Sequence, residues 1–169
     1  MISITLISFQ VVLGLIAIGT GATVLFGLLT GELLDRWTVN FLRCSLAASV
    51  IGLFFPFHPF EHLTPTQEIF MLSVYVAGAE ILAWRKYRLA GVWRSIFALT
   101  TTVVLYLNVA VAITQVFKHI SQIMAWAPAQ SQSTFLVTQL LVTAVFVVLG
   151  ILAVKRFQVK PIHKAIHSF

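Results

Sequence analysis

Long apolar stretches separated by short polar segments dominate the pattern of this chain. Five of them can be marked, at residues 6–29, 37–57, 68–84, 93–117 and 135–154. At about 1.5 Å per helical residue, such stretches cross, or nearly cross, a hydrocarbon core of about 30 Å. Continuous apolar runs favour helices, since the strands of a membrane barrel alternate polar and apolar residues. The pattern predicts an all-α integral membrane bundle of five transmembrane helices, forming a single domain over residues 1–169.

The composition agrees with a membrane location. Hydrophobic residues make up 59% of the chain and charged residues 9%, whereas a soluble domain carries about 25% charged residues. A chain of 169 residues with five spans has no room for a separate soluble catalytic unit. Its single cysteine, Cys44, excludes an intramolecular disulfide and a dithiol redox site. Most soluble enzyme classes are therefore excluded.

The basic residues are distributed very unevenly between the predicted connections. With five crossings, ten of the eleven lysines and arginines lie on one side, around 36–43, in 85–94 and in 155–164. The opposite side holds only Lys118. Because cytoplasmic loops carry an excess of Lys and Arg, we expect an outer amino terminus and a cytoplasmic carboxyl terminus in a bacterial inner membrane.

These charges also indicate partners. A basic cytoplasmic face can attract anionic lipid headgroups, at about 1 kcal/mol per residue near the surface. Nucleic acid is not expected, because the charges are sparse and flank apolar spans.

Small residues four apart, such as Cys44, Ala48 and Gly52, permit close helix contacts. Such contacts serve packing within the chain, a homo-oligomer or a larger membrane complex.

The fourth predicted span carries a regular row of polar residues. Arg94, Thr101, Asn108 and Gln115 are each seven positions apart, and such a row drifts only about 60° around a helix over its length. We expect it to face the protein interior. It then either forms hydrogen bonds between helices or lines a ligand pocket or polar path. Further residues expected in that interior are Tyr75, Tyr106 and Gln139.

Glu80 is the acidic residue that lies inside a predicted span. An intramembrane carboxylate suggests a functional site, and Arg43 and Arg94 are expected at a similar depth near the cytoplasmic ends of their spans. The three charges would form a cluster at the inner mouth of the bundle. Two interpretations remain open, a structural ion pair and a site for a proton or another ion.

The outer connections contain an expected helix and a candidate metal site. Apolar residues at helical spacing, ended by Pro128, predict a short interfacial helix at 119–127.

His58, His62 and His119 fall in or beside the outer connections, and imidazoles that converge there can bind a metal. Their spacing is unspecific, and HExxH, GxSxG, P-loop and GxGxxG motifs do not occur.

Three functions follow, in decreasing order of support. The first is a non-enzymatic membrane module that binds or passes a small, partly apolar ligand or an ion between its helices. The second is an accessory or assembly subunit that packs against a larger membrane complex. The third is a metal-dependent enzyme with a His and Glu site on the outer face. No cofactor is indicated by the sequence.

Overall fold

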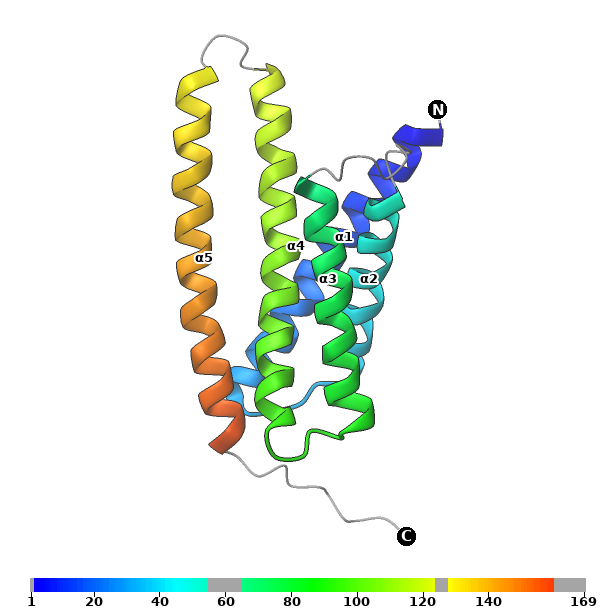
Figure 1. The fold of residues 1–169 in the computed structure, drawn as a ribbon, viewed down its shortest axis with the longest axis vertical. Helices are drawn as coiled ribbons and strands as arrows, with labels where there is room; N and C mark the ends of the chain where they lie inside the picture. The colour runs from blue at the N-terminus through cyan, green and yellow to red at the C-terminus, as the bar shows by residue number, and fades with distance from the viewer. Residues whose placement is uncertain (1, 55–64, 124–127, 160–169) are drawn as a thin grey trace.

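Helices that run alternately up and down make up the computed structural model, which describes residues 2–54, 65–123 and 128–159 (Figure 1). Those residues form helices and turns and contain no strand. The elements are α1 (Ile2–Thr30), α2 (Asp35–Phe54), α3 (Pro65–Ile81), a π-helical turn η1 (Leu82–Lys86), α4 (Trp93–Ile123) and α5 (Pro128–Val159). The all-α class predicted from the sequence is confirmed for these residues.

Local sequence explains where several helices begin and end. Helices α3 and α5 begin at Pro65 and Pro128, where the fixed φ of proline suits the first helical position and its missing N–H is not needed. Helix α1 ends before Gly31, which has a φ of +79°. The Gly31 and Glu32 amides donate to the Leu28 and Gly27 carbonyls over 3.2 and 2.8 Å. This pair of bonds is a Schellman cap, which favours glycine at the left-handed position.

The α1–α2 and α3–α4 connections and the end of α5 lie at the same end of the bundle (Figure 1). We call this the basic end, because the described residues in and beside these segments include Arg36, Arg85, Lys86, Arg88, Arg94, Lys155 and Arg156. At this end the Trp84 indole of η1 donates to Asp35 Oδ1 over 3.2 Å and joins η1 to the start of α2. The Tyr87 and Trp93 rings stack at 3.6 Å across the α3–α4 turn.

Helix α4 is the centre of the bundle. It packs against α1, α3 and α5, while α2 packs against α1 and α3. The core between these helices contains the buried side chains of Leu28, Phe41, Phe97, Val104 and Phe157. Helix α5 lies at one side of the bundle, with α4 as its main neighbour (Figure 1).

Three helices among the described residues are long and apolar enough to cross a membrane. The segments are Phe9–Thr30 of α1, Trp93–Phe117 of α4 and Ser133–Gln158 of α5. Within the chain, 39% and 44% of the apolar windows of α1 and α4 are buried, but only 6% of that of α5. An integral membrane helical protein is therefore supported, and few residues in the apolar window of α5 are fully buried within the chain.

The interfacial helix expected at 119–127 is not a separate element in the described part of the chain. Residues up to Ile123 continue α4, and α5 already begins at Pro128. Residues 118–123 contain neither proline nor glycine, so the local sequence does not end α4 before Ile123. Residues 124–127 lie outside the described residues.

Candidate functional site

A cavity of about 410 Å³ lies among α1, α2, α3 and α4. We call it the four-helix cavity. All four helices contribute polar side chains to it, and its polar lining residues are Gln10, Ser49, Ser73, Asn108 and Gln115. The rest of the lining is apolar, with Phe70 its aromatic residue. The cavity is thus mainly hydrophobic, with a few hydrogen-bonding groups that converge from different helices.

Asn108 connects this cavity to the neighbouring helix packing. Its Nδ2 donates to Ser45 Oγ of α2 over 3.1 Å and to the Val104 carbonyl of its own helix over 2.8 Å. These bonds hold the amide in place, while Gln115 lines the cavity two helical turns further along α4. Both interpretations of the polar row therefore find a structural counterpart, since Asn108 bonds between helices and also lines a cavity.

Glu80 and Thr101 form a buried pair between α3 and α4. Both side chains are fully buried, and the Thr101 hydroxyl donates to Glu80 Oε1 over 2.6 Å. The second carboxyl oxygen, Oε2, is buried and has no hydrogen-bond partner. In the sequence, Thr101 belongs to the polar row of the fourth span, whereas Glu80 was expected in the charge cluster with Arg43 and Arg94.

The structure does not place an arginine on the Glu80 carboxyl group. Oε1 accepts its bond from a hydroxyl, and Oε2 has no hydrogen-bond partner. The Arg43 side chain is exposed, and the Arg94 guanidinium lies 4.7 Å from the ring centre of Phe157 in α5. Arg94 precedes Thr101 by seven residues, about 10 Å along α4 toward the basic end. The expected three-charge cluster is therefore not seen as a hydrogen-bonded unit.

Tyr106 and Gln139 belong to a different face of α4. The Tyr106 hydroxyl lies 3.0 Å from Thr143 Oγ1 and accepts a bond from Gln139 Nε2 over 3.1 Å. This polar network joins α4 to α5. The residues predicted to share one interior therefore divide between two helix interfaces.

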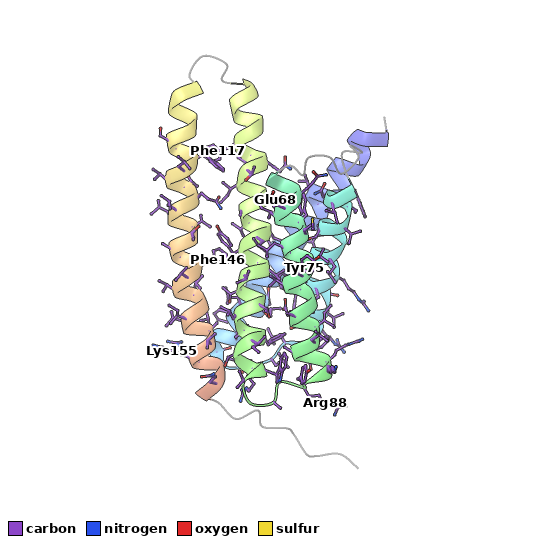
Figure 2. All side chains as sticks on the ribbon, in the orientation of Figure 1. Glu68, Tyr75, Arg88, Phe117, Phe146 and Lys155 are labelled. Atoms are coloured by element: carbon purple, nitrogen blue, oxygen red, sulfur yellow. The ribbon has the colours of Figure 1, made fainter. Side chains whose placement is uncertain are left out.

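Tyr75 does not point into the interior, contrary to the expectation from sequence. Its side chain is 71% exposed, while Ser73 and Ala77 on the same helix are buried. Two residues correspond to about 200° around a helix, so the buried face defined by Ser73 and Ala77 puts Tyr75 on the opposite side. In Figure 2, Tyr75 is labelled halfway along α3.

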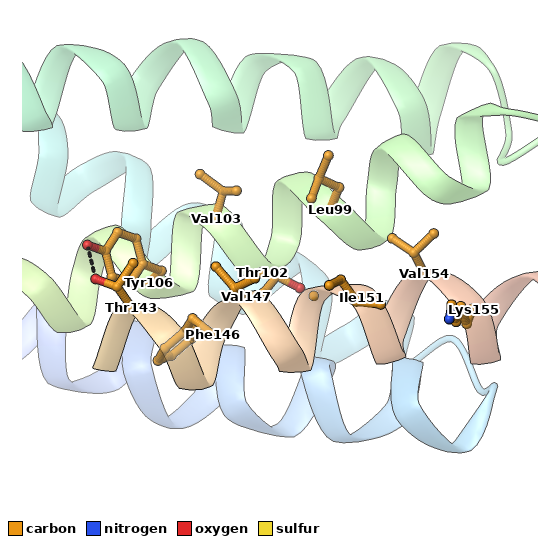
Figure 3. A pocket seen from close by; sticks show the side chains of 11 residues that line it. Leu99, Thr102, Val103, Tyr106, Thr143, Phe146, Val147, Ile151, Val154 and Lys155 are labelled. Carbon is orange, nitrogen blue, oxygen red and sulfur yellow. Dashed lines mark hydrogen bonds between the residues drawn. The ribbon is translucent and has the colours of Figure 1, made fainter. Parts of the chain in front are cut away.

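A second cavity, of about 420 Å³, lies between α4 and α5. We call it the α4–α5 groove, and Figure 3 shows it from close by. Its walls are almost entirely apolar, and Tyr106 and Thr143 lie at one end while Lys155 lies at the other (Figure 3). Gly150 lies beside Thr102 in this space, and a Cβ at Gly150 would make an ordinary van der Waals contact of 3.4 Å with Thr102 Cγ2.

The candidate metal ligands are not brought together in the described part of the chain. His58 and His62 lie outside the described residues, and His119 belongs to the last turns of α4. Among described residues there is no group of three or more histidine, cysteine, aspartate or glutamate side chains suited to a metal ion. The metal site stays a prediction from sequence.

Sequence analysis missed Gln10, Ser49 and Ser73 as lining residues of the four-helix cavity. A signal was present, because each is a polar residue within an otherwise apolar stretch, and such residues tend to face the bundle. Neither cavity could be recognised from the spacing of polar residues in the sequence.

Comparison with protein-family models, with curated proteins and with solved structures finds no match to this chain.

Proposed function

We propose that this chain is a non-enzymatic membrane module that binds a small, neutral and largely apolar ligand in the four-helix cavity. The observation that carries the proposal is the lining of that cavity. Amides and hydroxyls from four helices converge on an apolar space, and none of the described lining residues is ionisable. An apolar cavity with a few placed polar groups is the usual form of a small-molecule site.

The chemistry of the lining defines the class of ligand. Gln10, Asn108 and Gln115 offer both amide donors and carbonyl acceptors, so they suit a ligand with a carbonyl, hydroxyl or amide group. A charged ligand would lose its hydration without gaining a counter-ion, which is costly away from water. The volume of about 410 Å³ is near the lower end of the usual range for ligand pockets, about 300–1,000 Å³.

The topology that we propose is five crossings with the basic end in the cytoplasm. Helix α2 has 20 residues and α3 has 17 residues before the π-helical turn, which gives lengths of about 30 and 25 Å. The described basic connections share one end of the bundle (Figure 1). The positive-inside rule then supports a cytoplasmic basic end and an outer amino terminus in a bacterial-type inner membrane.

This topology predicts the response of a reporter inserted beside Arg88. An alkaline phosphatase reporter and a fluorescent protein reporter, each inserted at this position, are expected to report the cytoplasm. The same two reporters at the amino terminus are expected to report the outer compartment. A signal from the outer compartment at Arg88 would contradict the orientation. Insertion is expected to be tolerated because Arg88 lies in the exposed turn between η1 and α4.

Filling the four-helix cavity is expected to abolish ligand retention. A Cβ at Gly14 or at Gly19 of α1 would meet nothing within 4 Å, but only Gly14 lines the cavity. Gly14→Leu should displace the ligand, whereas Gly19→Leu should leave it in place. Removing one amide with Gln115→Leu should weaken binding about two- to thirteenfold, as expected for one lost hydrogen bond of about 0.5–1.5 kcal/mol.

Native mass spectrometry of protein released from mild detergent measures this retention directly. Wild type and Gly19→Leu should carry a small organic adduct, and Gly14→Leu should appear bare. A bare wild-type protein, or an adduct that survives in Gly14→Leu, would contradict the proposed function. Far-UV circular dichroism of each variant establishes that the helical fold is retained.

One observation favours a second candidate, an accessory or assembly subunit. The apolar window of α5 is only 6% buried within the chain, and its exposed residues include Leu140, Leu141 and Val145. Such a face suits lipid or a helix of a larger membrane complex. Purification that retains a stable heteromeric partner, with loss of that partner on changing α5 residues, would favour this candidate over ligand binding.

A further inference from the structure

The α4–α5 groove is open to the surroundings of the bundle. Leu99, Val147 and Ile151 line it and are each more than half exposed, at 52%, 56% and 52%. Both helices contain segments able to cross a membrane, so in a bilayer these residues face the acyl chains. The groove is therefore accessible from the lipid phase.

The length and the two ends of the groove correspond to one leaflet. Thr143 and Lys155 are twelve residues apart on α5, about 18 Å along its axis, and half of a hydrocarbon core of about 30 Å is about 15 Å. At the end of the groove farther from the basic end, the Tyr106, Thr143 and Gln139 network bridges α4 and α5. At the other end lies Lys155, in the last turns of α5 at the basic end (Figure 2).

Positive charge is concentrated where the groove reaches the membrane surface. Lys155 and Arg156 are exposed, and the Arg94 guanidinium packs over the Phe157 ring at the same end of the α4–α5 interface. Long basic side chains at a helix end extend their charge to the headgroup layer while their stems cover apolar surface. An anionic headgroup at this position would lie beside cations, with its acyl chain directed along the apolar walls.

We propose that the α4–α5 groove is a binding site for one anionic phospholipid of the leaflet at the basic end. One acyl chain occupies the space between Leu99, Val147 and Gly150, and the phosphate contacts Lys155. The site is independent of the proposed function, because the four-helix cavity involves α1 to α4 and none of its described lining residues is ionisable. Loss of lipid here should leave the neutral ligand in the other cavity, so the two proposals can fail separately.

The test compares a groove-filling variant with its matched neighbour. Val147 and Val148 are the same residue type and equally exposed, at 56%, but only Val147 lines the groove. Wild type, Val147→Trp and Val148→Trp are each incubated in detergent micelles with phosphatidylglycerol and phosphatidylcholine of identical acyl chains, in equal amounts. Native mass spectrometry then counts the lipids that each protein retains. Because both valines are exposed, neither change should disturb folding.

We expect wild type and Val148→Trp to retain one phosphatidylglycerol in preference to phosphatidylcholine, and Val147→Trp to lose it. Lys155→Gln should lower the preference about fivefold, the equivalent of roughly 1 kcal/mol for one interfacial cation. Lys86→Gln, which removes a lysine of the same end outside the groove lining, should not.

Three results would overturn the proposal. One is equal lipid retention by Val147→Trp and Val148→Trp, which places the lipid elsewhere. Another is an unchanged headgroup preference in Lys155→Gln. The third is a lipid-free dimer of wild type that Val147→Trp dissociates, which assigns the groove to a second copy of the chain.

Discussion

Replacing Thr101 with valine is expected to lower the free energy of unfolding by about 1–3 kcal/mol. The Thr101 hydroxyl donates to Glu80 Oε1, and Glu80 Oε2 already has no hydrogen-bond partner. Valine has nearly the same shape but no hydroxyl, so it would leave a fully buried carboxyl group with neither oxygen bonded. An unsatisfied buried polar group typically costs about 1–3 kcal/mol, and more when it is charged. Unfolding in mixed micelles, followed by circular dichroism, measures the change.

Thr100→Val is the matched control for this prediction. The Thr100 hydroxyl bonds only to carbonyls of its own helix, those of Ile96 and Phe97. Its loss should change stability by about 0.5 kcal/mol or less. Equal effects of the two valine substitutions would show that the Thr101 contact with Glu80 contributes nothing specific.

A double-mutant cycle separates the pair from its surroundings. In a Glu80→Met background the carboxyl group is absent, so Thr101→Val should cost much less than in wild type. The coupling between the two positions should then amount to about 1 kcal/mol or more, within the usual range for residues in contact. Additive effects would mean that the bond in the structure has no energetic role.

Gly21→Val is expected to cost about 1–3 kcal/mol, the usual effect of overpacking a core. A Cβ at Gly21 would lie 2.6 Å from Phe41 Cε2 of α2 and 2.8 Å from Leu105 Cδ1 of α4. Both neighbours are buried in the core, so they have little room to move. The glycine therefore allows α1 to approach α2 and α4 at the same point, and valine should force the three helices apart.

Gly19→Val is the control for Gly21→Val, because a Cβ at this position on the same helix meets nothing within 4 Å. We expect a stability within about 0.5 kcal/mol of wild type, measured by unfolding in mixed micelles as above. Equal destabilisation by both changes would indicate a loss of glycine flexibility, and would contradict close packing at Gly21. The small-residue spacing seen in the sequence did not identify this glycine.

The polar row of α4 shows how far sequence spacing can predict a site. A spacing of seven residues keeps successive members near one face of a helix, yet each member meets a different neighbour. Thr101 bonds to Glu80 of α3, Asn108 bonds to Ser45 of α2, and Gln115 lines the four-helix cavity. Spacing defines a face of one helix, but the partner of each residue depends on where the other helices cross it.

Tyr75 and Tyr106 show that the sequence also does not reveal which face of an apolar helix is buried. Both are amphipathic residues in apolar helices, and sequence analysis placed them in one interior. Tyr75 is 71% exposed, while Tyr106 is hydrogen-bonded between α4 and α5. In a soluble protein the apolar face of a helix reveals its buried side, but here apolar residues occupy both the lipid-facing and the packed surfaces.

The sequence alone determined the helical class, the apolar stretches and the concentration of basic residues in connections that share one end of the bundle. These follow from local chemistry, because a chain in hydrocarbon must satisfy its backbone hydrogen bonds within each helix. The tertiary structure alone decided which helices are neighbours, that Glu80 meets Thr101, and where the two cavities lie. The physical reason is that lipid and protein interior are equally apolar, so hydrophobic periodicity cannot distinguish them, and helix contacts depend on close packing and hydrogen bonds between distant residues.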